Sequence, residues 1–448
     1  MRWLRKTSFA NLVEKSWNVR AGTLGRLAVT VLVAFLTIYH GVQFAGYDTL
    51  LLIVKALLFD AWHVSGTLRC SRIVFRGAPR RPVTASDVPV DFLTVWNRKF
   101  NSPAVVDFRE DYLRNCQRTT RTLSAVVSSN RLTSPGLGLG SNINFVLNLF
   151  LLAKDAVAPR RNFQLYVVDW NYVSWSELFQ DFTAKSPCSI IHTMDPNAFQ
   201  SVNQSAQTFD LDSAWQVRAE SANDDHLLRE LNSDGYWNFY QQLTAYEASL
   251  PNGVTFRKKS LLARSLLDLQ PRLKDVLGQI WSNLVKEGAV HIRRGDKTVT
   301  GESINFPISL YVRALRRLCH TNPGRCSRIV YVFCDDAEVC ADFVNQAKEC
   351  FHVTDFRQQV KLKAILPWSE RSPVEFRHQN QFNSLPAEER LESAQEMIVS
   401  IYLAALSDFF VCTYSSNVCR LVALLKHDNI ADLDKDILSL DWSNWIMV

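Results

Sequence analysis

Short apolar runs alternate with helix-like stretches in the second half of the chain. The runs at residues 288–293, 328–334 and 409–413 are almost continuously apolar, and the stretches after them carry apolar residues at helical spacing. Buried strands that alternate with amphipathic helices are typical of a parallel sheet covered by helices on both faces. The pattern predicts strands at these runs and at 351–355, and helices at residues 307–319, 338–347, 392–406 and 417–425.

The first half follows the same alternation less regularly. Residues 121–128 and 163–169 are predicted strands, the glycine-rich segment 136–140 is a predicted turn, and apolar spacing predicts helices at 142–156 and 261–286. Two such halves indicate an α/β protein with two Rossmann-like, doubly wound domains. Ligands of that architecture bind in a cleft at the carboxyl ends of the strands, so chemistry is expected directly after each strand.

A different pattern precedes both halves. Residues 27–47 are 21 positions without Asp, Glu, Lys or Arg, enough for a helix to cross about 30 Å of hydrocarbon. Arg20 and Arg26 precede this run and Asp48 follows it. The positive-inside rule therefore predicts an uncleaved anchor with a cytosolic N-terminus. A cleaved signal peptide is the alternative, which the long N-terminal region and the lack of an A-x-A site disfavour.

These patterns divide the chain into five predicted parts. They are a cytosolic tail at 1–26, a transmembrane anchor at 27–47, a stem at 48–114, an acceptor-side Rossmann-like domain at 115–286 and a nucleotide-sugar-binding Rossmann-like domain at 287–448.

Composition and charge narrow the function classes. A hydrophobic fraction of 47% and a charged fraction of 21% exclude a disordered or collagen-like chain. The net charge of +6 is concentrated in the first 26 residues, which hold +5 of it. A nucleic-acid-binding protein would carry its excess charge on a folded domain, so no nucleic-acid partner is expected and a membrane partner is.

The ten cysteines all follow residue 47. An even number on the oxidising side of a secretory membrane makes disulfides the expected state. The chain has no C-x-x-C motif and no Cys/His cluster with zinc spacing, so no metal site is predicted from these residues. Asn203 begins an N-x-S sequon and is a candidate glycosylation site.

The strongest candidate chemistry follows the run at 288–293. Arg293, Arg294 and Lys297 form a basic cluster that can hold a diphosphate, since Arg binds phosphate oxygens bidentately and Lys adds a point charge. Asp296 could orient one of the arginines. Glu302, a little further on, is a candidate base for an acceptor hydroxyl. The alternative interpretation is a solvated basic turn with an internal salt bridge.

Three further strand or helix boundaries carry candidate ligand-binding groups. Carboxylates after a strand can accept hydrogen bonds from a ribose or purine, although one of them can instead cap the next helix. Hydroxyls and amides at a helix N-terminus can bind an anion, although a serine there can be a simple N-cap. Glycines let the backbone approach a phosphate closely, but the spacing is not that of a dinucleotide fingerprint. The carboxylates are Asp335 and Asp336, the hydroxyls belong to Ser415 and Ser416, and the glycines are Gly138 and Gly140.

Two long motifs resemble a known family. Residues 291–297 (HIRRGDK), followed by Glu302 and by Phe306-Pro307-Ile308, resemble the H-x-R-R-x-D-K…E…P-I signature of α1,6-fucosyltransferases. Residues 408–420 (DFFVCTYSSNVCR) are similar to the second signature of that family, including both cysteines. Weaker similarity extends the resemblance over roughly 120–425. At Ser400 the family has the acid that reads guanine, and Glu396 lies one helical turn earlier.

The resemblance implies a GT-B-like fold with two Rossmann-like domains facing a cleft, GDP-fucose as the donor, inversion at the sugar carbon, and neither cofactor nor metal. Carried over by motif, Arg293 with Arg294 would hold the β-phosphate, His291 would contact the nucleoside and Ser416 the diphosphate. Glu302 would deprotonate the acceptor with Lys297 close to the reacting centre. A Cys412–Cys419 disulfide is implied as well.

The sequence therefore predicts a single-pass type II Golgi membrane enzyme with a luminal catalytic domain, which transfers fucose to a glycan, with an α1,6 linkage to N-acetylglucosamine of N-glycans. A homodimer is left open. One alternative is a metal-dependent glycosyltransferase, because residues 210–212 and 432–434 both read D-x-D. The other is a membrane-anchored pseudo-enzyme that binds a glycan or nucleotide without turnover.

Overall fold

The computed structural model describes about half of the chain. Residues Thr84–Val448 form one compact unit. Within it the described ranges are 91–118, 122–128, 138–151, 162–168, 174–184, 191–194, 208–210, 215–219, 253–282, 287–294, 305–321, 329–348, 351–355, 382 and 384–441. The predicted tail and anchor lie outside these ranges. Among the helices in them, none is both long and apolar enough to cross a bilayer.

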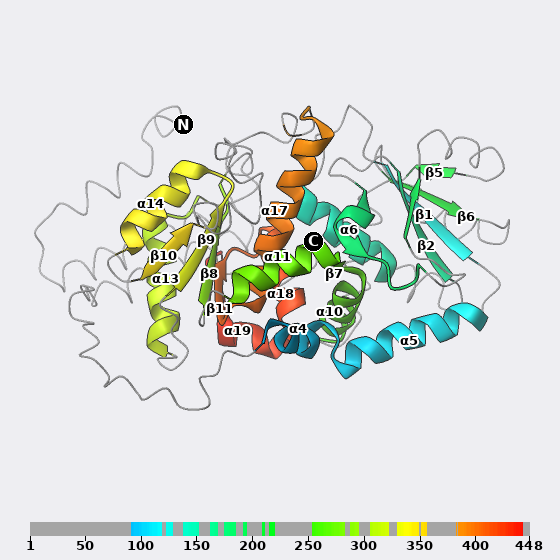
Figure 1. The fold of residues 1–448 in the computed structure, drawn as a ribbon, viewed down its shortest axis with the longest axis horizontal. Coiled ribbons are helices and arrows are strands. Elements are labelled where there is room, and N and C mark those ends of the chain that lie inside the picture. The colour runs from blue at the N-terminus through cyan, green and yellow to red at the C-terminus, as the bar shows by residue number, and fades with distance from the viewer. Residues whose placement is uncertain are drawn as a thin grey trace, which may run out of the picture. The chain divides into compact units, whose positions relative to one another are not determined.

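The second half of the chain builds a sheet of five parallel strands (Figure 1). Its spatial order is β10-β9-β8-β11-β12. The chain runs outward from β8 to β10 and then returns to the other side of β8, so the order reverses between β8 and β11. All of the predicted strands here are confirmed. The strands are β8 (Glu287–Ile292), β9 (Ile329–Cys334), β10 (His352–Asp355), β11 (Phe409–Cys412) and β12 (Ile437–Ser439).

Helices cover both faces of this sheet, as the apolar runs predicted. Strand residues that alternate along β8 belong to two separate cores: Val290 packs in one core with Tyr311 of α13, and Ala289 packs in the other with residues of α17 and α18. Successive side chains of a strand point to opposite faces, which explains the division. The four helices are α13 (Ile308–Thr321), α14 (Ala337–Ala347), α17 (Ala387–Leu406) and α18 (Asn417–Lys426).

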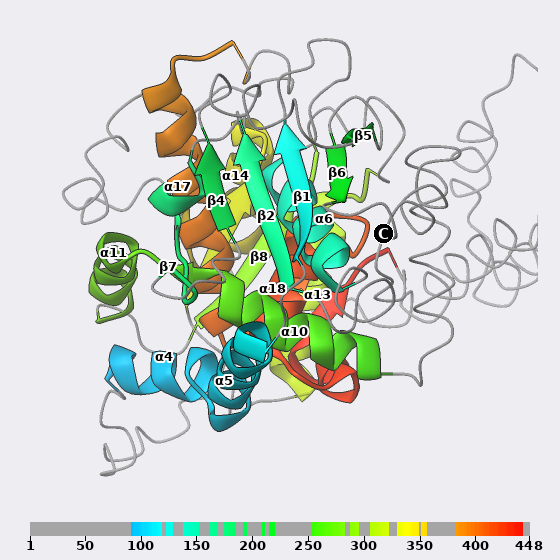
Figure 2. The ribbon, with the colours of Figure 1, turned by 90° about the vertical axis from the view of Figure 1, so that its right-hand side faces the viewer.

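The first sheet corrects the prediction of a doubly wound parallel domain. Strands β1, β2 and β4 run parallel to one another, but β6 is antiparallel to both β1 and β5, so the sheet is mixed. A short connection joins β5 to β6, and only antiparallel neighbours can be joined that way. Figure 2 shows β1, β2, β4 and β6 side by side. The strands are β1 (Thr122–Ser128), β2 (Asn162–Val168), β4 (Ile191–Met194), β5 (Thr208–Asp210) and β6 (Trp215–Ala219).

Helices of the first half differ from the predicted ranges at their ends. α6 (Leu139–Leu151) begins inside the glycine-rich segment. The predicted helix at 261–286 is two helices, α10 (Val254–Leu266) and α11 (Pro271–Ser282), separated by the short strand β7 (Asp268–Leu269). Proline has no amide hydrogen and suits a first helical position, so Pro271 begins the second helix.

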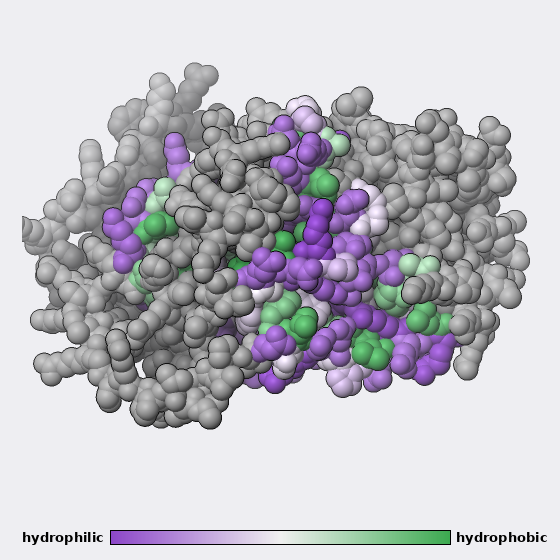
Figure 3. Space-filling model, in the orientation of Figure 1, coloured by the Kyte–Doolittle hydropathy of each residue, from purple (hydrophilic) through white to green (hydrophobic). Residues whose placement is uncertain are grey.

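The segment just before β1 also joins the core. Within the predicted stem, α4 (Phe92–Phe100) buries Phe92, Trp96 and Phe100, and α5 (Pro103–Arg118) follows it. The Trp96 ring stacks on Tyr402 of α17 with 5.5 Å between ring centroids. Most of the described surface in the view of Figure 3 is polar. Among the described residues, the large apolar side chains that remain exposed are Leu93 of α4, Val106 of α5 and Val254 of α10.

Candidate functional site

The candidate site lies at the carboxyl edge of the second sheet. Because β8 stands between β9 and β11, the segments that follow these three strands meet at one edge. The strand order reverses between β8 and β11, and open α/β sheets bind their ligands at such a point. The sequence predicted candidate residues after each of the three strands, and the structure brings those segments together.

Arg293 is oriented by a carboxylate from the neighbouring strand. Its guanidinium Nη1 lies 2.5 Å from Oδ2 of Asp335, and both side chains are partly buried. Oδ1 of Asp335 accepts the backbone N–H of Arg294 at 2.7 Å. A single carboxylate therefore fixes the turn that leaves β8 and the guanidinium that follows it. Asp335 was expected to meet a ribose or purine, whereas here it positions the arginine.

Arg294 points toward a different part of the structure. Its Nη2 donates to the carbonyl of Phe306, just before α13. Tyr311, on α13, is fully buried, and burial raises its pKa above the usual value while Arg294 opposes that shift. The contact holds the segment before α13 in place. One nitrogen of the Arg294 guanidinium is thus engaged by the chain itself, and the diphosphate clamp of Arg293 and Arg294 stays a prediction.

His291 is a buried, neutral imidazole. Its ring packs against Phe333 at 5.1 Å between centroids, and only 5% of the residue is exposed. Burial lowers the pKa of His291 to about 3, and the positive charge of Arg293 adds to the effect. The Nδ1 atom has no hydrogen-bond partner among the residues that the structure describes. A neutral ring can donate one hydrogen bond and accept another.

The turn from β11 into α18 provides the second half of the site. The N–H of Ser416 donates to the carbonyl of Thr413 at 3.0 Å, and Ser416 is the N-cap residue of α18. Its side chain caps none of the helix amides. The first amides of a helix have no partner within the helix, so those of Asn417, Val418 and Cys419 depend on other groups. Such an end attracts an anion.

The glycine-rich segment reaches the same helix end. A Cβ on Gly140 would lie 3.4 Å from the backbone of Asn417 and Val418. Nδ2 of Asn144 donates to the carbonyl of Asn417 at 3.0 Å, and Nδ2 of Asn417 donates to Oγ of Ser141 at 2.7 Å. Gly140 therefore lies against the first turn of α18, where a Cβ would make ordinary van der Waals contact. Gly138, by contrast, supplies a carbonyl to the first turn of α6, where it accepts from the N–H of Asn142 at 3.0 Å.

Two disulfides tie strand ends to the helices that follow them. The Cys412–Cys419 bond, which the family resemblance implied, joins the end of β11 to the first turn of α18. A second bond joins Cys334, the last residue of β9, to Cys340 in α14. The sequence offered the same signal for both pairs: a cysteine that ends an apolar run and another six or seven residues later. Only the first pair was predicted.

Other candidates serve local structure. Asp336 is the N-cap of α14 and accepts the N–H groups of Glu338 and Val339 at 2.9 and 3.3 Å, as its alternative interpretation predicted. The Ser400 hydroxyl donates to the Glu396 carbonyl at 2.8 Å within α17. It is therefore engaged within its own helix at the position where the family places a guanine-reading acid.

The remaining predictions cannot be placed. Asp296, Lys297, Glu302 and Asn203 lie outside the described residues. Of the two D-x-D motifs, the one at 432–434 has Asp432 hydrogen-bonded to Lys435, which lowers the pKa of the Asp432 carboxyl. In the described part of the chain, no group of three or more His, Cys, Asp or Glu residues is arranged to hold a metal ion.

The solved structures to which this chain is similar include two fucosyltransferases by name, FUT1 and POFUT1. A mutant of Arabidopsis thaliana FUT1 in complex with GDP is 12% identical, with a TM-score of 0.35, over 75% of this chain and 76% of that one. The apo form of POFUT1 is 11% identical, with a TM-score of 0.36, over 71% of this chain and 97% of that one. No protein-family model matches the chain, and no curated protein sequence is similar to it.

Proposed function

We propose that the chain is an inverting fucosyltransferase that moves fucose from GDP-fucose to a glycan hydroxyl without a metal ion. The two signatures at 291–308 and 408–420 support this proposal. The observation that carries it is the placement of Arg293, oriented by Asp335, at the strand edge from which the N-terminus of α18 also begins.

The donor diphosphate binds between the Arg293 guanidinium and the first turn of α18. Both groups are positive, and they come from β8 and β11, the two strands at which the sheet order reverses. Positive groups fixed in advance stabilise the charge that develops on departing GDP, which a divalent metal does in other glycosyltransferases. The buried His291 and the half-buried Phe333 that packs against it lie next to Arg293, and this edge receives the nucleoside.

The chemical step is a single displacement. Glu302 takes the proton of the acceptor hydroxyl as its oxygen attacks C1 of fucose. The bond from C1 to the β-phosphate oxygen breaks, and its electron pair leaves with GDP. Lys297 stands close to the reacting centre. Attack from the face opposite the leaving group inverts the sugar carbon.

The acceptor is an N-acetylglucosamine of an N-glycan, to which the enzyme forms an α1,6 linkage. The chain is a type II Golgi membrane protein, anchored by residues 27–47, with its catalytic part in the lumen and a glycan on Asn203. The two disulfides support an oxidising compartment. The proposal leaves a homodimer open.

A donor screen tests this function. The full chain is incubated with a panel of nucleotide sugars and an N-glycan mixture, with and without EDTA. We expect transfer from GDP-fucose alone, at the same rate in both conditions. Loss of transfer in EDTA favours the metal-dependent alternative. Binding of GDP without transfer to any acceptor favours the pseudo-enzyme and contradicts the proposal.

A further inference from the structure

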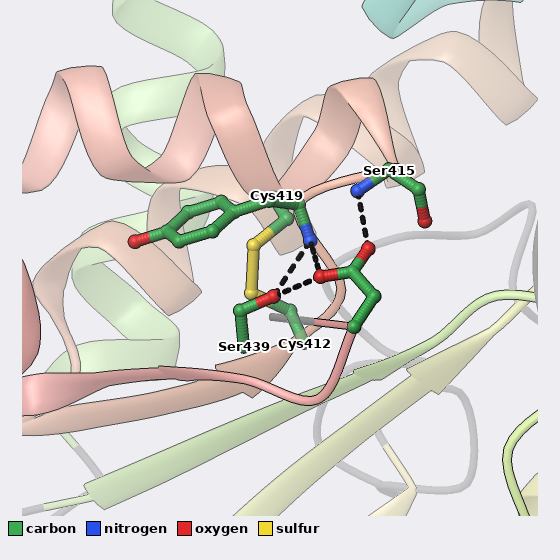
Figure 4. Close-up of a disulfide and its surroundings, with 6 residues drawn as sticks. Cys412, Ser415, Cys419 and Ser439 are labelled. Atoms are coloured by element: carbon green, nitrogen blue, oxygen red, sulfur yellow. Dashed lines mark hydrogen bonds between the residues drawn. A yellow bond between two sulfur atoms is a disulfide. The ribbon is translucent and has the colours of Figure 1, made fainter. Parts of the chain in front are cut away.

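A carboxylate from the last described residue holds the turn between β11 and α18. Oδ1 of Asp441 accepts the N–H of Tyr414 at 3.0 Å, and Oδ2 accepts the N–H of Ser415 at 2.6 Å. Oγ of Ser439, at the end of β12, accepts the same Tyr414 N–H at 2.8 Å and donates to Asp441. Figure 4 shows Ser439 below the turn and the hydrogen bond that reaches Ser415.

Asp441 is buried as well as fully engaged. Only 6% of the residue is exposed, and its two carboxylate oxygens bind two consecutive amides. It lies beyond both signature motifs and beyond the region of family resemblance. An ionised carboxylate near an anion-binding helix end repels a diphosphate, so attraction of the donor cannot be its role. Its contacts instead fix the path of the chain immediately before Ser416.

The turn is restrained from two sides. The Cys412–Cys419 disulfide closes the loop between the end of β11 and the first turn of α18. Asp441, two residues after the adjacent strand β12, holds the middle of the same loop. The disulfide limits the distance between the ends of the loop, whereas the carboxylate sets the direction of its amides. Neither restraint can replace the other.

We propose that Asp441 is a positioning residue for the nucleotide donor, an inference that rests on the proposed function. Acting as an internal anion, it occupies the amides of Tyr414 and Ser415. The diphosphate is then restricted to the amides of Asn417 to Cys419, with the Ser416 hydroxyl beside them. Without Asp441, the turn amides compete for the phosphate, and the first turn of α18 loses its fixed relation to Arg293.

The test compares Asp441→Asn with a matched control, Asp432→Asn. Asn keeps the shape of Asp and one acceptor oxygen but turns an NH₂ group toward the second amide, so one hydrogen bond to a charged group is lost. Asp432 is in the same segment and pairs with Lys435 instead of the turn. The full chain is used throughout, and both GDP binding by calorimetry and the KM and kcat for GDP-fucose are measured.

We expect Asp441→Asn to weaken GDP binding about tenfold and to raise KM more than it lowers kcat, while Asp432→Asn changes neither. A role in folding alone would lower the melting temperature and the active fraction, and so kcat, without changing the Kd for GDP. Ser439→Ala keeps the carboxylate and should weaken GDP binding about threefold. The Ser439→Ala variant tests the positioning role if the Asp441→Asn variant does not fold.

The outcomes separate the two proposals. If the unsubstituted chain binds GDP, and the folded Asp441 and Ser439 variants bind it within twofold as tightly, the positioning role is wrong and the proposed function stands. If the unsubstituted chain binds no GDP, the proposed function fails and this inference fails with it.

Discussion

The backbone groups at the two ends of α18 differ in whether side chains satisfy them. At its C-terminus, Oγ of Ser260 lies 2.7 and 2.6 Å from the carbonyl oxygens of Leu424 and His427, which share its single hydrogen, and the Ala423 carbonyl accepts the N–H of His427 at 3.0 Å. His427 Nε2 lies 2.5 Å from Oδ1 of Asp436, and Lys426 Nζ lies 3.6 Å from Oδ2 of the same carboxylate. At its N-terminus, the Ser416 side chain caps nothing. The closed end serves stability, whereas the amides at the open end are the donors that the proposed function assigns to the diphosphate.

Other helices end near the closed end of α18 and are satisfied in the same manner. Lys426 Nζ also donates to the Ser407 carbonyl at the end of α17, and Lys99 of α4 donates to the Ala405 carbonyl at 2.5 Å. Arg109 of α5 donates to the Arg264 carbonyl at the end of α10, at 3.1 Å. Long basic side chains thus reach the carbonyls that each helix leaves without partners. Substitutions at the two ends of α18 should therefore have different consequences.

The largest effect should come from Arg293→Ala, beside the open end. Removing a fixed positive group from a developing negative charge lowers turnover by about 10³-fold. The melting temperature should change little, because the side chain is partly exposed. Arg313→Ala, an exposed position on α13, is the control for loss of an arginine. Turnover of Arg293→Ala equal to that of the unsubstituted chain would refute the assignment.

At the closed end, Lys426→Met should reduce the free energy of unfolding by about 3 kcal/mol. The substitution removes one member of a buried ion pair and a donor to the end of α17. Lys435→Met, which breaks only the exposed pair with Asp432, should cost less than about 1 kcal/mol. Urea unfolding measures both. The folded Lys426 variant should keep its affinity for GDP, and a clear loss would show that the two ends of α18 are not independent.

Asp335→Asn should have an intermediate effect on the open end. The Arg293 guanidinium keeps its positive charge but loses the carboxylate that orients it. We therefore expect turnover to fall about 30-fold, which corresponds to roughly 2 kcal/mol in activation free energy. Asp336→Asn is the matched control, since Asp336 is the next residue in the chain and is the N-cap of α14. Equal losses of turnover in the two variants would contradict a specific role for the ion pair.

The Arg293–Asp335 pair also shows what the sequence could not predict. Continuous apolar runs were enough to find β8 and β9, because burial on both faces leaves a local pattern. The register, in which Ile292 lies opposite Cys334, places Arg293 next to Asp335. Register and strand order depend on distant segments, so the partner of Arg293 was not predictable, and neither was Asp441, a single carboxylate outside any motif.

Local patterns failed in the first half for a related reason. Residues 208–210 and 215–219 form an antiparallel pair of short strands without a long apolar run. The burial of Trp96 depends on contact with Tyr402 of α17, which lies far away in the chain, and no local pattern specifies that partner. In contrast, the turn at 413–416 was predicted from hydroxyls that lie between an apolar run and a helical pattern, because strand, turn and helix N-terminus are adjacent in the chain.

The last expected effect is a pH dependence at the closed end, which is small for each pH unit. Burial lowers the pKa of Lys99 well below its usual value, and the nearby charges of Lys426 and Arg264 lower it further against the opposing influence of Asp436 and Asp408. Between the lowered pKa and the unfolded value of about 10.4, the unfolded chain binds one more proton than the folded chain at this site. The free energy of unfolding should therefore rise with pH in that window, by at most about 1.4 kcal/mol per pH unit.

Comparison with Lys99→Met isolates this contribution, since Met cannot titrate. Urea unfolding at pH 8, 9 and 10 should show the stability of the unsubstituted chain rising relative to that of the variant. Below the lowered pKa both states carry the proton, and the difference between the two proteins becomes constant. A difference that stays constant from pH 8 to pH 10 would mean that Lys99 is charged in the folded protein over this range, and would contradict the prediction.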